Sequence, residues 1–211
     1  MKNDLIAIKK SLSTILTEKR FYHTLGVEAV SFSLAARYEC DTNQAALAGL
    51  LHDLARCFPD PELLKQCDTY HLPISEVERR NPYLLHGKLG AYQAKEVYGI
   101  TDSNIISAIA YHTTGKQDMN LLEKIVFTAD YIEPNRSGKH IPDLNEIRSL
   151  AFHDLDQAVY RILDNTLKYL DSGTQEMDPL TVEAYNFYKK KLNPGSCENF
   201  GSSQLPKNKI T

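Results

Sequence analysis

Seven histidines are spread along the chain, and their chemistry depends on which of them face the interior of the protein. His23 stands four residues before Val27 and eleven before Leu34, so all three share one face of a helix. His112 follows Ile109 on the apolar stripe of another helix. Imidazoles that point inward from such stripes are candidates for binding a metal ion.

Two further histidines stand beside small residues. The pair His52-Asp53 follows Gly49, where another helix or a cofactor can come close. His86 has Gly90 one turn ahead, and a glycine there leaves space above the helix for a ring or a ligand. Both histidines are therefore further candidates for a binding site.

Asp130 lies in the apolar segment LLEKIVFTADYI, residues 121–132. An aspartate there is unfavourable for the helix and costly to bury unless a cation or hydrogen-bond donors compensate it. A bound metal would do so, because imidazole nitrogens and carboxylate oxygens together suit zinc, iron or manganese. The order His23, His52-Asp53, Asp130 is therefore interpreted as one set of metal ligands.

Each of these residues also has a structural interpretation. A single inward histidine is more often a hydrogen-bonded core residue than a ligand, but several together favour a shared site. The second pair, His153-Asp154, is expected to be structural, because Asp154 precedes an apolar helix pattern with a glutamine three residues on, as in a capping box. His71 and His140 stand in loops two residues before prolines and are assigned no role.

The composition is that of an ordinary globular protein. The 211 residues, 42% hydrophobic and 24% charged, predict a single domain over residues 1–192. A net charge of −3 argues against a broad basic surface, so a nucleic-acid polymer is not an expected partner. The four cysteines show no C-x-x-C spacing, which favours reduced thiols in the cytoplasm, and neither a signal peptide nor a membrane anchor is expected.

Apolar residues recur at spacings of three and four along most of the chain, which predicts an all-α fold. Asp102 can cap the helix that it opens, and Gly99 can end the helix before it. The segment 193–211 is rich in Gly, Ser, Asn and Pro and predicts a flexible C-terminal tail. The expected helices span residues 3–18, 20–38, 42–55, 60–70, 82–98, 102–112, 119–133, 143–151, 154–171 and 178–192.

Five segments carry a resemblance to a known family: FYHTLGVEAV, ALAGLLHDLAR, LLHGKLGAYQA, AIAYHTTG and EKIVFTADYIEPNR. In this order and spacing they resemble the HD superfamily of metal-dependent phosphohydrolases, and in particular its YqeK branch. That branch is described as a symmetrical bis(5'-nucleosyl)-tetraphosphatase, which splits diadenosine tetraphosphate into two molecules of ADP. The resemblance covers about residues 20–188 and implies an HD-domain helical bundle.

The resemblance also implies a ligand set. His23, His52, Asp53 and Asp130 should hold one divalent metal, for which family members favour iron, with manganese and zinc as alternatives. His86 and His112 match positions that either complete a second metal site or touch the substrate phosphates, and the sequence leaves both roles open.

Phosphate chemistry needs cations that balance the charge of the substrate. Arg56 lies one turn beyond Asp53, and these two are the expected catalytic residues. A solvated surface role is the competing interpretation of the arginines, and it carries equal weight for Arg20. A polyphosphate with two purine ends also needs a long groove, of which residues 173–177 are expected to form one wall. The expected substrate-binding residues are Arg20, His23, Arg56, His86, His112, Thr113, Arg136, Gly173, Thr174 and Gln175.

Two other functions remain open at this point. The same metal site could serve an HD-type hydrolase of nucleoside mono- or triphosphates or of a guanosine alarmone. A helical module that senses a nucleotide without cleaving it is the alternative outside the enzymes. The converging ionisable groups favour an enzyme whose partners are a dinucleoside polyphosphate or ADP. The oligomeric state stays open, with a homodimer as one option.

Overall fold

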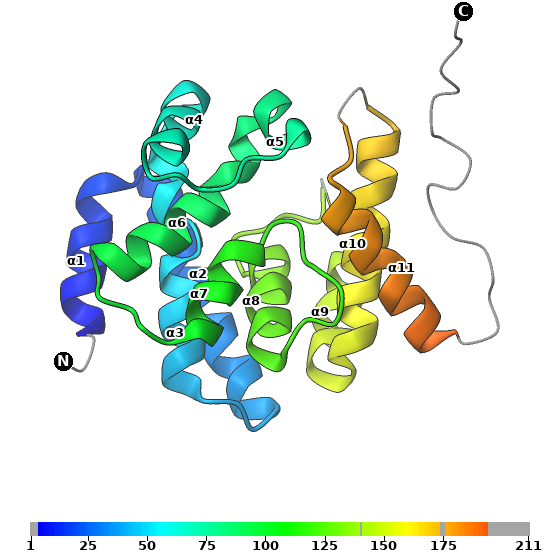
Figure 1. The fold of residues 1–211 in the computed structure, drawn as a ribbon. Coiled ribbons are helices and arrows are strands. Elements are labelled where there is room, and N and C mark those ends of the chain that lie inside the picture. Colours follow the sequence, from blue (N-terminus) through cyan, green and yellow to red (C-terminus); the bar gives the residue numbers. More distant parts are fainter. Residues whose placement is uncertain (1–3, 140, 174–175, 194–211) are drawn as a thin grey trace, which may run out of the picture.

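A computed structural model describes residues 4–139, 141–173 and 176–193 of the chain. Within these residues the secondary structure is helical, with no strand, which confirms the expected all-α fold (Figure 1). The expected tail lies outside them from residue 194 on. The helices are α1 (Leu5–Ile15), α2 (Glu18–Arg37), α3 (Thr42–Leu51), η1 (Leu54–Cys57), α4 (Asp60–Thr69), α5 (Glu76–Arg80), η2 (Pro82–Leu84), α6 (Leu85–Glu96), α7 (Ser103–Tyr111), α8 (Leu121–Ile132), α9 (Leu144–His153), α10 (Leu155–Asp171) and α11 (Pro179–Leu192).

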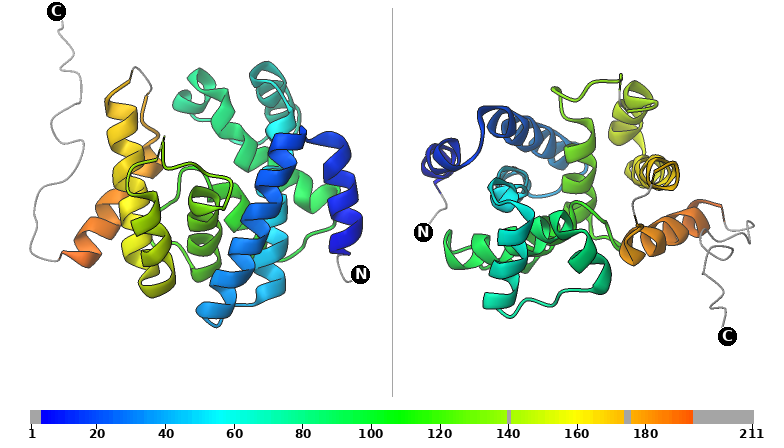
Figure 2. Two further views of the ribbon diagram at one scale, coloured as in Figure 1. Left: turned by 180° about the vertical axis from the view of Figure 1, so that it is seen from behind. Right: turned by 90° about the horizontal axis from the view of Figure 1, so that it is seen from above.

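The centre of the molecule is built from α2, α3, α7 and α8. Helix α2 packs along both α3 and α8, α7 packs against α6 and α8, and α10 packs between α8, α9 and α11 (Figures 1 and 2). A Cβ atom on Gly49 of α3 would stand 3.1 Å from the Val27 carbonyl oxygen of α2, so only glycine allows these two helices to approach this closely. The small residues before His52 thus admit another helix, as the sequence predicts.

Helix α4 and the neighbouring parts of η1 and α6 form a smaller unit at the edge of this bundle (Figure 1). Its own apolar cluster is separate from the main core of buried residues. Lys88 of α6 also pairs with the buried Glu78 carboxylate of α5 at 2.7 Å. The cluster consists of Ala55, Leu63, Cys67, Leu85 and Leu89.

Helix termini that carry a capping residue in the sequence lie where they are expected. The Asp102 carboxylate accepts hydrogen bonds from the first amides of α7, and Gly99 adopts a positive φ of 68° just after α6. The Asp154 carboxylate accepts from the Gln157 amide at the start of α10. This confirms the structural role of Asp154 and distinguishes it from Asp53, whose side chain caps no helix.

Two local predictions are wrong. The helix expected over residues 42–55 ends at Leu51, because the chain turns at His52 and Asp53 before η1 begins. The short helix α5 was not expected, because its five residues EVERR are too few to show an apolar period. The Ser75–Glu78 capping box holds α5 in place.

In the described part of the chain, no helix combines the length and the apolar character that a membrane span requires.

Candidate metal and phosphate site

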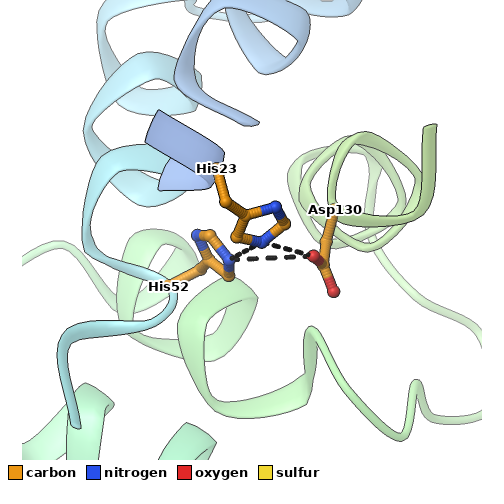
Figure 3. Close-up of side chains that lie close together, drawn as sticks. All are labelled: His23, His52 and Asp130. Carbon is orange, nitrogen blue, oxygen red and sulfur yellow. Dashed lines mark hydrogen bonds and ion pairs between the residues drawn. The ribbon is translucent and has the colours of Figure 1, made fainter. Parts of the chain in front are cut away.

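Three helices bring His23, His52 and Asp130 together at the centre of the bundle (Figure 3). His23 lies in the second turn of α2, His52 directly follows α3, and Asp130 lies near the end of α8. The Nε2 atom of His23 is 3.0 Å from Oδ1 of Asp130 and 3.3 Å from Nε2 of His52. Residues more than a hundred positions apart thus converge on one point, as the sequence predicts.

Three of the buried histidines of this region share one hydrogen-bonding pattern. Nδ1 of His52 donates to the Gly49 carbonyl at 2.7 Å, and Nδ1 of His112 donates to the Ile109 carbonyl at 2.8 Å. Nδ1 of His86 donates in the same way to the Tyr83 carbonyl. Because a carbonyl oxygen can only accept, each Nδ1 must carry the proton, and each neutral ring presents the lone pair of Nε2.

The lone pairs of His86 and His112 converge, and the Thr113 hydroxyl lies within hydrogen-bond reach of both. The Nε2 atoms of His86 and His112 lie 3.1 Å apart, with the Thr113 hydroxyl 3.1 Å from each. Burial and the neighbouring His52 and His86 lower the pKa of His112 to about 3, so its ring stays neutral. Neutral imidazoles with fixed tautomers and converging lone pairs are suited to hold a cation.

The two oxygens of Asp53 face two different groups of histidines. Oδ2 lies 3.4 Å from Nε2 of His52 and 3.6 Å from Nε2 of His23. Oδ1 lies 3.4 Å from Nε2 of His86 and 3.8 Å from Nε2 of His112. The Asp53 carboxylate therefore lies between two groups of possible metal ligands. One is His23, His52 and Asp130, and the other is His52, Asp53 and His112, with His86 beside it.

Interactions with their neighbours keep the two aspartates ionised. Burial alone would raise the pKa of Asp53, but the neighbouring histidines, His52 foremost, hold it well below its usual range. Burial opposes ionisation of Asp130 as well, yet the hydrogen bond from His23 and the charge of Arg136 lower its pKa. Both carboxylates are thus available as anionic ligands at neutral pH.

Two arginines lie on the open side of this centre. Nη1 of Arg20 is 2.6 Å from Oδ2 of Asp53, and Nη2 of Arg136 is 2.7 Å from Oδ1 of Asp130. Both side chains are about one-third exposed, with relative accessibilities of 34% and 36%. Arg20 is therefore not simply a solvated surface residue, because its guanidinium group pairs with the buried carboxylate of Asp53.

Glu133 also belongs to this site, although its sequence context does not indicate it. Its buried carboxylate accepts from Nδ1 of His23 at 3.1 Å and from the Asn135 amide at 2.7 Å. A Cβ atom on Gly26 would stand 2.5 Å from Oε2 of Glu133, so only glycine admits this contact from α2. The quoted segment EKIVFTADYIEPNR contains Glu133, but its place just after an apolar helix gave no sign that it faces His23.

The segment that follows α8 is held in place by Arg148 of α9. Its guanidinium group donates to the backbone carbonyls of Ile132 and Glu133, each at 2.9 Å, and of Arg136 at 3.2 Å. A single side chain thus satisfies three carbonyls at and beyond the end of the helix. This clamp fixes the segment that carries Glu133 and Arg136 beside the candidate metal ligands.

A cavity of about 770 Å³ opens onto the His23 side of the centre. Its wall includes Lys19, Arg20, His23, Glu133 and Arg136. The volume lies in the range of small-molecule sites, and the cations in the wall favour an anionic ligand.

The remaining predicted residues lie elsewhere. Arg56 lies in η1 and does not line the cavity described above. The pKa of His86 is lowered mainly by the burial of its ring, and the charge of Arg56 lowers it further. Gly173 is exposed at the end of α10, and Thr174 and Gln175 lie outside the described residues. A Cβ atom on Gly90 would lie 3.6 Å from the His52 carbonyl oxygen and 3.6 Å from the Ile109 side chain, so the space beside this glycine is occupied by protein rather than by a ligand.

Comparison with known proteins agrees with this geometry. Residues 20–135, which include both groups of histidines and Asp130, match the HD domain family. The chain is also 38% identical over 172 residues to the symmetrical bis(5'-nucleosyl)-tetraphosphatase of Bacillus subtilis, covering 82% of this chain and 90% of that protein. The chain belongs to the HD-domain family, in the branch of these tetraphosphatases.

Further relatives of the HD-domain chain span most of its length. The symmetrical bis(5'-nucleosyl)-tetraphosphatase of Staphylococcus aureus is 35% identical over 175 residues, covering 82% of this chain and 88% of that protein. A crystal structure from Clostridium acetobutylicum, described as a predicted HD superfamily hydrolase involved in NAD metabolism, has a TM-score of 0.85 and 38% identity. It covers 89% of this chain and 98% of the other, so the helical arrangement is shared throughout.

Proposed function

We propose that this protein is a metal-dependent hydrolase that cleaves diadenosine tetraphosphate symmetrically into two molecules of ADP. The observation that carries the proposal is the convergence of four imidazole Nε2 atoms and two ionised carboxylates beside a cavity lined by cations. The names of the relatives from Bacillus subtilis and Staphylococcus aureus support the same reaction.

The residues present fit divalent metal ions. His23, His52, Asp53 and Asp130 would hold one ion, and His86, His112 and the second oxygen of Asp53 would hold another. The mixture of imidazole and carboxylate ligands suits iron, which we propose as the resident metal, ahead of manganese or zinc. Bound metal ions would lower the pKa of water toward about 7 and polarise a phosphoryl oxygen.

The chain's own residues would complete the reaction. Hydrolysis at the centre of the tetraphosphate adds one water across a phosphoanhydride bond and releases one ADP from each half. Arg20 and Arg136 would neutralise the negative charge that develops on the bridging oxygen and on the attacked phosphoryl group. Thr113 would donate a hydrogen bond from the side of His86 and His112, where Arg56 adds positive charge.

Glu133 has a positioning role in this proposal. Its carboxylate accepts from Nδ1 of His23 and so orients Nε2 toward the metal position. Arg148 supports this role through the backbone of the same segment.

The cysteines bear on where the protein works. Cys40, Cys57 and Cys67 are free thiols. We propose that the protein works in the cytoplasm, where thiols stay reduced.

The proposed activity is tested by chromatographic analysis of products. Purified protein is incubated with ferrous or manganous ion and diadenosine tetraphosphate, and separately with ATP, AMP and guanosine tetraphosphate. ADP as the sole nucleotide product, with the other three nucleotides intact, is the expected result. Release of AMP together with ATP from the dinucleotide, or cleavage of a control nucleotide alone, would overturn the symmetrical reaction while leaving a metal-dependent hydrolase.

A further inference from the structure

Helices α5 and α8 both begin with a capping box whose glutamate is buried. Each glutamate also pairs with a lysine from outside its own helix. The Glu78 carboxylate is 2.7 Å from Nζ of Lys88, and the Glu123 carboxylate is 2.8 Å from Nζ of Lys116. A capping box is complete without such a lysine, so these pairs need another explanation. We call them the Glu78–Lys88 brace and the Glu123–Lys116 brace.

The Glu78–Lys88 brace encloses the segment that holds His86. Nζ of Lys88 donates to the Pro73 carbonyl at 2.8 Å as well as to Glu78, so it joins α6 both to α5 and to the chain before α5. Between these contacts lies η2, whose Tyr83 carbonyl accepts from Nδ1 of His86. The brace therefore fixes the carbonyl group that sets the tautomer and the orientation of the His86 ring.

The Glu123–Lys116 brace holds the segment that links α7 to α8. This segment begins beside His112, and the Thr113 hydroxyl in it lies 3.1 Å from Nε2 of His112. Oε1 of Glu123 pairs with Lys116 from the same segment and also accepts from the Ser107 hydroxyl of α7. A single carboxylate of α8 is thus bonded to α7 and to the segment between the two helices.

Burial makes both braces resistant to separation. The side chains of Glu78 and Glu123 are 7% and 1% exposed, respectively. A carboxylate at such a depth is costly unless a counter-charge and hydrogen-bond donors compensate it. A movement of η2 or of the linking segment that broke a brace would leave this charge uncompensated. Each brace therefore favours one position of the segment that it encloses.

The two braces meet on one side of Asp53. Helices α6 and α7 pack against each other, and the Nε2 atoms of His86 and His112 lie 3.1 Å apart (Figure 1). His23, on the other side of Asp53, is oriented by a different residue, because its Nδ1 donates to Glu133. The braces should therefore act on one side of the centre and not on the other.

We infer that the two braces are positioning devices for His86 and His112, which they hold in the geometry that a second metal ion requires. The inference rests on the proposed function, because it takes this side of Asp53 to bind an ion. The brace residues would touch neither the ion nor the substrate and would act through the two histidines.

Manganese binding tests the inference in Glu78→Gln and Glu123→Gln. Calorimetric titration should show the second manganese ion weakened by about tenfold in each variant, with the first ion unchanged. In the electron paramagnetic resonance spectrum, the signal of a coupled manganese pair should give way to that of a single ion. The matched control is Asp156→Asn, which removes a carboxylate that pairs with Lys124 at 2.8 Å and ties α8 to α10. This control should bind both ions as the wild type does.

Substitutions of the lysines keep the test open if a glutamate variant does not fold. Lys88 and Lys116 have side chains that are 28% and 31% exposed, so their loss should disturb the fold less. Lys116→Met should weaken the second ion, and Lys116→Arg, which keeps the charge, should restore most of the affinity. Thermal unfolding of the metal-free variants is compared with that of Asp156→Asn. Parallel weakening of both ions together with the thermal stability would overturn the inference.

The outcomes separate the braces from the reaction. If the second ion is weakened selectively in the brace variants while the wild type does not split diadenosine tetraphosphate, the inference stands and the proposed function fails. If the wild type splits the dinucleotide and both glutamine variants bind two ions as tightly as it does, the proposed function stands and the inference fails. A wild type that binds a single manganese ion would also overturn the inference.

Discussion

The two sides of Asp53 differ in their access to solvent and in their charge. On one side, Oδ2 faces His23 and the arginine-lined cavity, where Arg20 makes an ion pair with it. On the other side, Oδ1 faces His86 and His112, which are both buried. One carboxylate thus joins an open, cationic half of the site to a closed, neutral half.

The difference indicates a division of labour between the two halves. The closed half offers neutral imidazoles whose Nδ1 protons are fixed by backbone carbonyls, which suits the holding of an ion. The open half offers charged groups that can exchange one partner for another, which suits the binding and release of phosphate. Asp53 couples the halves, so changes there should have the largest effect.

Asp53→Ala should abolish both metal retention and hydrolysis, because both candidate cation positions lose their shared carboxylate. His52→Ala should have the same effect, because His52 belongs to both groups of residues that could hold a metal ion. Metal content measured by elemental analysis, together with the rate of ADP formation, checks this expectation. The matched control is His153→Ala, which should keep nearly full turnover. Its exposed ring bonds to the Ser149 carbonyl and, within the described part of the chain, lies outside both groups of possible metal ligands. Full activity in Asp53→Ala would contradict the proposed site.

Substitutions on one side alone should separate the two metal positions. His23→Ala should remove the ion of the open half, and His86→Ala the ion of the closed half, so each variant should retain one ion where the wild type retains two. Both variants should lose turnover. Metal-to-protein ratios after gel filtration provide the measurement, and two ions retained in His86→Ala would show that His86 contacts phosphate instead.

Arg136→Gln should lower kcat by about 10²- to 10³-fold while the metal content stays unchanged, because this residue would stabilise charge that develops during the reaction. Arg56→Gln should have a smaller effect, since Arg56 does not line the cationic cavity. Steady-state kinetics with diadenosine tetraphosphate compares the two. A larger loss in Arg56→Gln would assign the phosphate contacts to the closed half.

Glu133→Gln should weaken metal binding by about 10- to 100-fold. A neutral amide accepts a weaker hydrogen bond from Nδ1 of His23, so the ring is oriented less firmly and its Nε2 becomes a weaker metal ligand. Competition with a coloured chelator measures this affinity. The fold should persist, so the circular dichroism spectrum serves as the control. An unchanged metal affinity would remove Glu133 from the positioning role.

The pH dependence of metal binding should arise in the open half. Burial lowers the pKa of His23, but hydrogen bonds to Asp130 and Glu133 outweigh it and raise the pKa from 6.5 to about 9. This proton stabilises the metal-free fold below pH 6.5, and the stabilisation is lost as the pH rises through about 9.

A metal ion at His23 must displace the same proton. Its affinity should therefore rise with pH, by up to about tenfold per pH unit, and level off near pH 9. Calorimetric titration at several pH values measures the slope. A slope of zero across this range would show that His23 carries no proton for the metal to displace.

The sequence predicts most of the fold because long helices show their apolar period directly. It does not predict the end of α3 at Leu51, since LHDLA continues the same apolar pattern. The helix ends there because the His52 ring turns back to the Gly49 carbonyl. That contact is a property of the folded turn and leaves no trace in the periodicity.

Only part of the site can be predicted from the sequence. His23 and Asp130 are predictable because a polar side chain on an apolar helix face is an exception to the pattern around it. Glu133 and Arg148 act through contacts between α8, α9 and α2. Each occupies an ordinary position for a charged residue in its own segment, so only the tertiary structure identifies it.

The central claim is that a metal centre at Asp53 carries the symmetrical cleavage, and metal add-back tests it most directly. The protein is stripped with a chelator, measured equivalents of ferrous ion are returned under anaerobic conditions, and ADP formation from diadenosine tetraphosphate is followed. The account predicts no turnover in the stripped protein and a rise to full rate as two ions bind, with ADP as the only nucleotide product. Full activity in the stripped protein would contradict it.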